Sequence, residues 1–260
     1  MKLFFLIFLI LLSGFLYSQD GFPGMIGGYG DLKFIPPQTL QPNEFSFARL
    51  VYNGRVPMLN KNWYTDYPEG DKTIVTVLKR ITNIDIAPEL RAVPINSSDL
   101  FKYPFLFSSE GGQIVLDDND ADRMREYLDR GGFWMIDDFW GSIEWGDFEK
   151  EIKKIFPEKE IFKITIEHPI FHTVFEIEKV IQVPNVRIVD CATCPTWEQD
   201  GYNPEVKGIF NDNGDLMVVI FFNTDTMDAL EWADEPLYSH HFSAYAFKIF
   251  INTIVYAMTH

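Results

Sequence analysis

Short apolar runs alternate with amphipathic stretches over most of the chain, starting at Phe45. Apolar runs of about four to eight residues are typical of buried strands, and apolar residues spaced three or four apart are typical of helices. The runs that predict strands are 45–52, 103–107, 132–136, 161–164, 180–183, 208–210 and 216–223. The stretches that predict helices are 71–83, 118–130, 145–155 and 243–258. This alternation predicts an α/β protein whose mostly parallel, doubly wound sheet is covered by helices on both faces, giving three layers.

The acidic stretch 117–122 has two interpretations. An EF-hand beginning at Asp118 requires Gly at its sixth position and Glu at its twelfth, but this chain has Arg123 and Asp129 there. The stretch therefore predicts the start of a helix rather than a calcium loop. We expect Asp118 to be the N-cap and Gly131 to end the helix.

The first residues have the layout of a secretory signal peptide. Lys2 precedes an uncharged and mostly apolar run, 3–17, which is shorter than the roughly 20 apolar residues that a spanning helix needs. Ser18 is a small residue at a plausible cleavage point. We therefore expect a signal peptide over 1–18, a periplasmic or secreted protein, and no membrane span after cleavage. An uncleaved anchor is the alternative.

The rest of the chain divides into two parts by composition. Residues 19–43 are rich in Gly and Pro, which predicts a flexible segment. Residues 44–260 contain no repeat and no second low-complexity break, and their length suits one α/β domain. We predict a signal peptide, a flexible segment and a single domain.

The net charge limits the kinds of partner that the protein is expected to bind. The formal net charge is −16, and such a surface repels phosphate backbones. We therefore expect no nucleic-acid partner. A small molecule or an envelope protein remains as the partner, and a cationic ligand or a divalent metal suits the sign. Excess acid is also typical of an ordinary solvated surface.

Several carboxylates follow the predicted strands. In doubly wound sheets ligands bind beyond the carboxyl ends of the strands. The candidate pocket residues at these ends are Glu110, Asp137, Asp138, Trp140, Asp225 and Glu231. Because neighbouring side chains on a strand point to opposite sides, we expect at most one of the pair Asp137 and Asp138 to face the pocket. If the carboxylates converge, they can bind a hard cation or act as an acid and base pair. The alternative is that they cap turns.

Aromatic residues also lie near these strand ends. They are Trp63, Tyr64, Tyr67, Phe139, Trp140 and Trp232. Such rings can stack on a sugar or a peptide, or they can fill the core. The sequence does not decide between these roles.

The cysteines and histidines offer weaker signals. Cys191 and Cys194 form a C-x-x-C pair, which in an exported chain predicts a local disulfide. Half of a zinc site, completed by His240 and His241, and a redox pair are the alternatives. His168 and His172 are four residues apart, but the intervening Pro169 favours a structural role over metal ligation. No metal ligand set and no cofactor is predicted.

Standard catalytic motifs are missing from the sequence. There is no G-x-S-x-G elbow, no G-x-G-x-x-G and no Walker loop. Ser109, next to Glu110 and Gly111, is an unorthodox nucleophile candidate. Whether the chain is an enzyme stays open.

Several strings together resemble the bacterial family catalogued as domain of unknown function 4159. The matching strings are 47–52, 63–71, 103–106, 127–128 with 131–138, 168–172, 223–232 and 252–259. The resemblance implies a three-layer fold similar to class I glutamine amidotransferases and to trehalose-utilisation-like domains, often in exported or membrane-attached proteins. It implies no known activity. Amidotransferases carry a catalytic Cys at the strand-to-helix elbow, but the matching turn here, 108–112, has none. Glutaminase activity is therefore not expected.

Two main functions follow from these observations. The first is a cell-envelope binding or interaction module that has an amidotransferase-like fold without the catalytic Cys. The second is a carboxylate-dependent hydrolase, with or without a metal, that uses Glu110, Asp137 or Asp138, and Asp225 or Glu231. A scaffold partner in an envelope complex is a third possibility.

Overall fold

The computed structural model describes residues 44–55, 62–189 and 193–260, which all belong to one compact unit. The predicted signal peptide and the predicted flexible segment lie outside the described residues. So does Cys191. None of the helices in the described part of the chain has the length and apolar character needed to cross a bilayer.

A seven-stranded sheet forms the centre of the protein, in the order β3-β1-β4-β6-β9-β8-β7. The first five strands are parallel. At one side of the sheet, β8 runs antiparallel to β9, and β7 runs antiparallel to β8. The strands are β1 (Ala48–Val51), β3 (Arg91–Pro94), β4 (Phe105–Ser108), β6 (Phe133–Ile136), β7 (Phe162–Lys163), β8 (Glu205–Phe210) and β9 (Leu216–Phe222). A separate pair joins β2 (Asn53–Gly54) to β5 (Ile114–Val115). The predicted mostly parallel sheet is confirmed.

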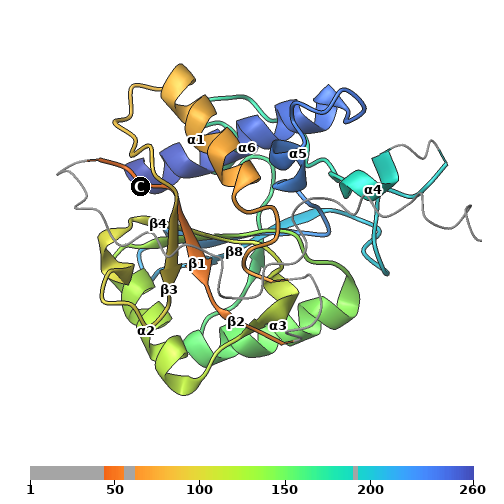
Figure 1. The fold of residues 1–260 in the computed structure, drawn as a ribbon. Helices are drawn as coiled ribbons and strands as arrows, with labels where there is room; N and C mark the ends of the chain where they lie inside the picture. The colour runs from red at the N-terminus through yellow and green to blue at the C-terminus, as the bar shows by residue number, and fades with distance from the viewer. Residues whose placement is uncertain (1–43, 56–61, 190–192) are drawn as a thin grey trace, which may run out of the picture. The chain divides into compact units, whose positions relative to one another are not determined.

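Helices cover both faces of this sheet, which confirms the three layers (Figure 1). One face carries α1 (Glu69–Ile81), α5 (Asp228–Glu231) and α6 (His240–Thr259), and the other carries α2 (Asp118–Asp129) and α3 (Gly141–Ile155). The shorter helices are α4 (Val186–Val189) and the 3-10 turns η1 (Leu100–Lys102), η2 (Gly111–Gln113) and η3 (Pro169–Phe171). Each long predicted helix is present.

Three details differ from the predictions. The run 180–183 forms no strand, although Val183 is buried. Strand β3 was not predicted, because its four residues, which include Arg91 and Pro94, do not form an apolar run. The N-cap of α2 is Asp117 rather than Asp118, since the Asp117 side chain accepts a hydrogen bond from the backbone N–H of Asp120 and the Asp120 side chain returns one.

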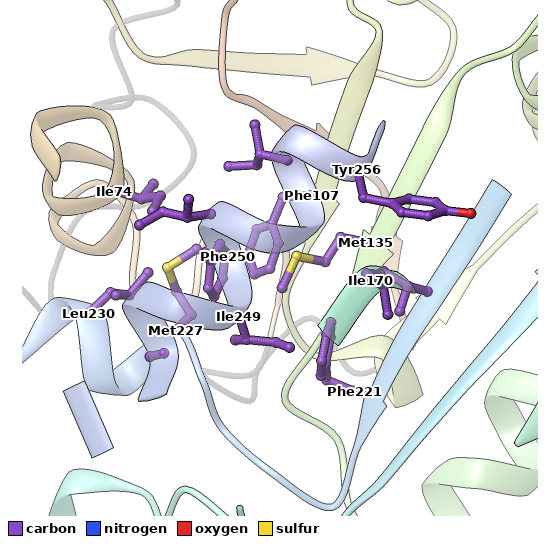
Figure 2. Close-up of a cluster of buried hydrophobic side chains, with 14 of the residues drawn as sticks. Ile74, Phe107, Met135, Ile170, Phe221, Met227, Leu230, Ile249, Phe250 and Tyr256 are labelled. Atoms are coloured by element: carbon purple, nitrogen blue, oxygen red, sulfur yellow. The ribbon is translucent and has the colours of Figure 1, made fainter. Parts of the chain in front are cut away.

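Alternation along the strands separates two apolar layers. Phe105 and Phe107 of β4 point to the α1/α6 face, and Leu106 points to the α2/α3 face. Figure 2 shows the first layer, in which Phe107 of β4 and Phe250 of α6 pack together, with Met227 and Leu230 nearby. Both layers are fully buried, so helices on each face hold the sheet rigidly.

The parallel strands place their carboxyl ends at one edge of the sheet. Strand β1 is flanked by β3 and β4, which both follow it in the chain, so the strand order reverses at this point. In doubly wound sheets, ligands bind at the carboxyl edge where the order reverses. The loops that follow β1, β4, β6 and β9 therefore form the part of the molecule to search for a site.

Candidate functional site

Five carboxylates meet at the carboxyl edge of the sheet, and we call them the acidic cluster. They are Asp66, Asp138, Asp225, Asp228 and Glu231. They form two groups that share Asp66, one with Asp138 and Asp225 and one with Asp228 and Glu231. Within each group, one oxygen of every carboxylate lies within 4.8 Å of the others. Segments far apart in the sequence thus place acidic side chains at the same point.

Asp66 lies in the loop 62–68 before α1, and a buried arginine holds this loop. Arg49 in β1 is completely buried, and its Nη1 donates hydrogen bonds to the carbonyl oxygens of Trp63, at 3.0 Å, and Thr65. Its Nε donates to the carboxylate of Asp71, at 3.1 Å to Oδ2. Arg49 therefore fixes both the loop that carries Asp66 and the first turn of α1.

The start of α1 also packs closely against the turn that carries the other carboxylates. Gly70 approaches Met227 so tightly that a Cβ atom at Gly70 would lie 2.5 Å from the Met227 sulfur. Any larger residue at Gly70 would force the Met227 side chain to move, so glycine permits the close contact between α1 and this turn. This contact brings Asp66 to the segment that contains Asp225 and Asp228.

Asp138 follows β6 and is buried. The indole Nε1 of Trp140 donates a hydrogen bond to its Oδ1 at 3.2 Å, and the hydroxyl of Ser109 lies 3.5 Å from its Oδ2. Trp140 is itself completely buried. It therefore positions the Asp138 carboxylate from within the core, and its ring is not available to stack on a ligand.

The turn after β9 supplies the remaining carboxylates. Asp225 accepts a hydrogen bond from the backbone N–H of Asp228 at 3.0 Å, and Asp228 accepts one from the backbone N–H of Val186 at 2.6 Å. Asp228 and Glu231 lie one turn apart on the short helix α5, so they share a face. Met227, the N-cap of this helix, and Leu230 pack into the core (Figure 2).

Asp137 lies under this turn rather than in either group. Its Oδ2 accepts hydrogen bonds from the hydroxyl of Thr226, at 2.7 Å, and from the backbone N–H of Met227, at 2.9 Å. Its Oδ1 is buried and has no hydrogen-bond partner. Asp137 thus fixes the turn that carries Asp225, and it adds a further buried carboxyl next to the cluster.

The backbone is strained at the same edge. Positive φ angles occur at Asp66 (62°), Glu110 (54°), Asp138 (56°) and Asn223 (59°). Each such angle costs about 1 kcal/mol in a residue that has a side chain, and such strain gathers at functional sites. Asp66 precedes α1, and the other three positions follow strands β4, β6 and β9. The fold therefore tolerates strain where the carboxylates are presented.

Burial and mutual repulsion both raise the pKa values of the acidic cluster. Desolvation raises the pKa of Asp66 well above its usual range, and the charges of Asp228 and Asp138 add to this effect. Desolvation and the charge of Asp138 raise the pKa of Asp225 in the same way. Burial raises the pKa of Asp228 to about 7 and that of Asp137 to about 8. Burial also raises the pKa of Glu231. The cluster is short of positive charge.

The geometry suits a hard cation. Calcium binds six to eight oxygen ligands at about 2.3–2.6 Å, so two of its ligands lie up to about 5 Å apart. The oxygens of each group, within 4.8 Å of one another, can therefore reach a single ion. All the side-chain ligands are carboxylates, which favour calcium or magnesium over softer metals.

The structure brings together some of the predicted pocket residues and separates others. Asp138, Asp225 and Glu231 belong to the acidic cluster. Asp138 rather than Asp137 joins it. Glu110 belongs to neither group, and lies buried at the tight turn after β4. The hydroxyl of Tyr52 donates to the carbonyl oxygens of Ser109 and Glu110 and fixes this turn.

Sequence reasoning missed Asp66 and Asp228. A signal for Asp228 exists, because it lies three residues before Glu231 and therefore on the same helical face. No local signal marks Asp66, which enters the site through the loop that Arg49 holds.

The other candidates have structural contacts. His172 contacts the carboxylate of Glu176 at 2.6 Å, and Nδ1 of His168 accepts from the backbone N–H of Ile170 at 3.2 Å. Cys194 is disulfide-bonded, whereas Cys191 lies outside the described residues. A disulfide sulfur is not a thiolate and does not bind zinc.

Comparison with known families matches residues 46–258 to the family described as Domain of unknown function (DUF4159). A comparison with curated proteins gives no match. The matched residues include every member of the acidic cluster.

Proposed function

This chain belongs to the DUF4159 family, and we propose that it is an exported binding module whose site is the acidic cluster and whose ligand is a hard divalent cation, calcium or magnesium. The family description names no activity. The proposal therefore rests on the chemistry of the cluster itself.

One observation carries this proposal. The Oδ2 oxygen of Asp66 is buried within the cluster and has no hydrogen-bond partner. An ionised carboxylate that is buried without a partner costs several kcal/mol, so proteins seldom leave one uncompensated. A bound cation compensates it, and the cluster directs several other carboxylates to the same point.

The nearby buried cation does not fulfil this role. The Nε and Nη2 groups of Arg49 donate to Asp71, and its Nη1 donates to two backbone carbonyls. Its charge lowers the pKa of Asp66, but this effect is smaller than those of burial and of the other carboxylates. The Arg49 guanidinium therefore binds Asp71 and orders the loop, and the carboxylates of the acidic cluster remain available to bind a ligand.

Export enters the proposal from the sequence of residues 1–18. Calcium sites in extracellular modules bind with dissociation constants of about 0.1–1 mM. We expect an affinity in this range. Cell fractionation tests the location: the protein is expected in the periplasm or the medium, with a mature N-terminus close to Gln19. An intact N-terminus at Met1 in the cytoplasm would contradict export without affecting the cation site.

Calorimetric titration tests cation binding. Calcium and magnesium are added separately to the metal-free protein and to the Asp225→Asn variant, which removes one charge from the cluster and keeps the shape of the side chain. Glu151→Gln is the matched control, because Glu151 is a buried carboxylate on the other face of the sheet. The proposal predicts that cation binding is reduced in Asp225→Asn and unchanged in Glu151→Gln. Equal binding by both variants, or none by the native protein at 10 mM (about ten times the weakest expected dissociation constant), would contradict it.

A carboxylate-dependent hydrolase is the second candidate, and the turn after β4 favours it. Glu110 has φ 54° and ψ 52° and lies between a strand and the 3-10 turn η2. Gly111 packs so closely that a Cβ atom there would lie 2.7 Å from Ile136. A strand, a strained residue and a close glycine also make up the nucleophile elbow of hydrolases. This turn supports the proposed likeness to amidotransferases, with Glu110 in place of their Cys.

Activity assays separate the two candidates. Phosphate, glycosidic and peptide model substrates are tested with the native protein in the presence of calcium or magnesium. Hydrolysis that is lost in both Glu110→Gln and Asp138→Asn, with unchanged unfolding, would favour the hydrolase. Cation binding without turnover of any substrate would favour the binding module.

A further inference from the structure

We infer that the acidic cluster binds two divalent cations, with Asp66 as the carboxylate that bridges them. This inference deepens the proposed cation site and rests on it. It concerns how many ions the site takes and which side chain they share.

The arrangement of the carboxylates is the first argument. Asp138 and Asp225 approach Asp66 from the ends of β6 and β9, whereas Asp228 and Glu231 approach it from α5. Asp66 is common to both groups, and the 4.8 Å separation holds within each group. Each group supplies the three oxygen ligands that can anchor one hard cation, with water completing the coordination. The structure thus provides two adjacent positions.

The Asp66 carboxylate suits a bridging role. Its Oδ2 is buried without a hydrogen-bond partner, so this oxygen is free to bind an ion. The loop that carries it is held by the hydrogen bonds from Arg49 to the carbonyls of Trp63 and Thr65. The backbone N–H of Gly70 also donates to the Asp66 carbonyl at 2.9 Å. These hydrogen bonds hold residues 63–66 and so present the Asp66 carboxylate to both groups.

The charge balance is the second argument. The cluster contains five carboxylates, of which Asp138, Asp225 and Asp228 are at least 96% buried as residues. When all are ionised, one divalent cation leaves three negative charges at a largely dry site, whereas two cations leave only one. Like charges about 4 Å apart repel by about 4 kcal/mol at an effective dielectric constant of 20. A second cation therefore lowers the net charge of the ionised site from −3 to −1.

Asp137 adds to this charge without joining either group. It is completely buried, and its Oδ1 has no hydrogen-bond partner. Asp137 is an independent sign that this part of the protein is built to face positive charge.

Equilibrium dialysis against manganese, followed by elemental analysis, measures the number of ions on the purified full chain. Two manganese ions per chain are expected for the native protein and for the Glu151→Gln control. Glu231→Gln and Asp225→Asn are each expected to retain one ion, because each alters one group only. Asp66→Asn is expected to lose both ions at the same manganese concentration. Urea unfolding of each variant shows whether it is folded.

Electron paramagnetic resonance tests the bridge. Two manganese ions joined by one carboxylate give a spin-coupled spectrum, and titration of the second ion produces it. Two ions without coupling would overturn the bridging role of Asp66. One ion per native chain, lost in all three cluster variants, would overturn the second site and leave the proposed function intact. No bound manganese at all would overturn both.

Discussion

Glu151 and Asp66 are both acidic side chains with buried oxygens, and the protein surrounds them very differently. Glu151 on α3 accepts hydrogen bonds from the backbone N–H of Leu116, at 2.9 Å, and from the ammonium of Lys154, at 2.7 Å. Asp66 has a buried oxygen without a partner and four other carboxylates near it. The first is compensated within the fold, and the second is not.

Other buried carboxylates near Glu151 and Asp66 show the same contrast. Glu144, also on α3, accepts from the backbone N–H of Trp140 at 2.7 Å and from the side chain of Gln199 at 2.8 Å. On the other face, the pKa values of Asp66, Asp225 and Asp228 are all raised by burial. A buried carboxylate is thus not in itself evidence of a site. The evidence is that the fold compensates one set and leaves the other uncompensated.

Among single substitutions, the largest effect on stability is expected at Arg49, which pairs with Asp71 and holds the loop that carries Asp66. Arg49→Met leaves Asp71 buried without its partner and frees the loop that carries Asp66. Breaking a buried ion pair typically costs about 3–5 kcal/mol. We expect a loss of this size in the free energy of unfolding, measured in urea.

Arg125→Met is the matched control for this substitution. Arg125 pairs with Glu158 at the surface, and both side chains are more than a third exposed. Exposed pairs contribute about 0–1 kcal/mol. Similar losses in the two variants would mean that Arg49 is no more important for the fold than a surface arginine.

The pH dependence of stability is the next expected effect. Burial raises the pKa of Asp228 to about 7 and that of Asp137 to about 8, whereas an unfolded Asp titrates near 4. Between about pH 4 and pH 8 the folded protein therefore holds more protons than the unfolded chain. Its stability falls as the pH rises through this range, by about 1.4 kcal/mol per pH unit for each extra proton.

Urea unfolding in chelator at several pH values measures this slope. Asp137→Asn is expected to make the slope shallower, because it removes one of the titrating groups. Calcium is expected to restore stability at pH 8. A stability that stays constant or rises between pH 4 and pH 8 in chelator would show that these carboxyls are compensated in the folded state.

A smaller effect, of opposite sign in the two regions, sharpens the comparison. Asp138→Asn removes one of the mutually repelling charges of the acidic cluster. We therefore expect the free energy of unfolding of the metal-free protein at pH 8 to rise by about 1 kcal/mol. Glu151→Gln removes a charge that accepts hydrogen bonds from Lys154 and the backbone N–H of Leu116, so we expect the free energy of unfolding to fall by about 1 kcal/mol. Both values are measured by urea unfolding in chelator. A loss in both variants would mean that the cluster stabilises the fold by itself.

The layers of the fold were predictable because apolar periodicity records burial. The runs at 132–136 and 216–223 contain enough apolar residues to mark central strands, and both form the middle of the sheet. Strand β3 escaped prediction because it lies at the edge of the sheet and its residues, which include Arg91 and Pro94, do not form an apolar run. The run 180–183 is apolar because Val183 packs into the core from a loop.

The site was predictable only where it follows a strand. Asp138 and Asp225 come directly after β6 and β9, so the rule for carboxyl ends located them. Asp66 lies between β2 and α1 and is placed by hydrogen bonds from Arg49, which the sequence does not reveal. Trp140 looked like a binding residue because it follows a strand, but its side chain turns inward and donates to Asp138.

A crystal of the purified protein soaked in manganese, with data collected at the manganese absorption edge, tests the central claim most directly. The account predicts strong anomalous density bounded by the carboxylates of Asp66, Asp138 and Asp225, and none beside Glu151. Density beside Glu151, or the absence of density at the acidic cluster in a crystal that has taken up manganese elsewhere, would contradict it.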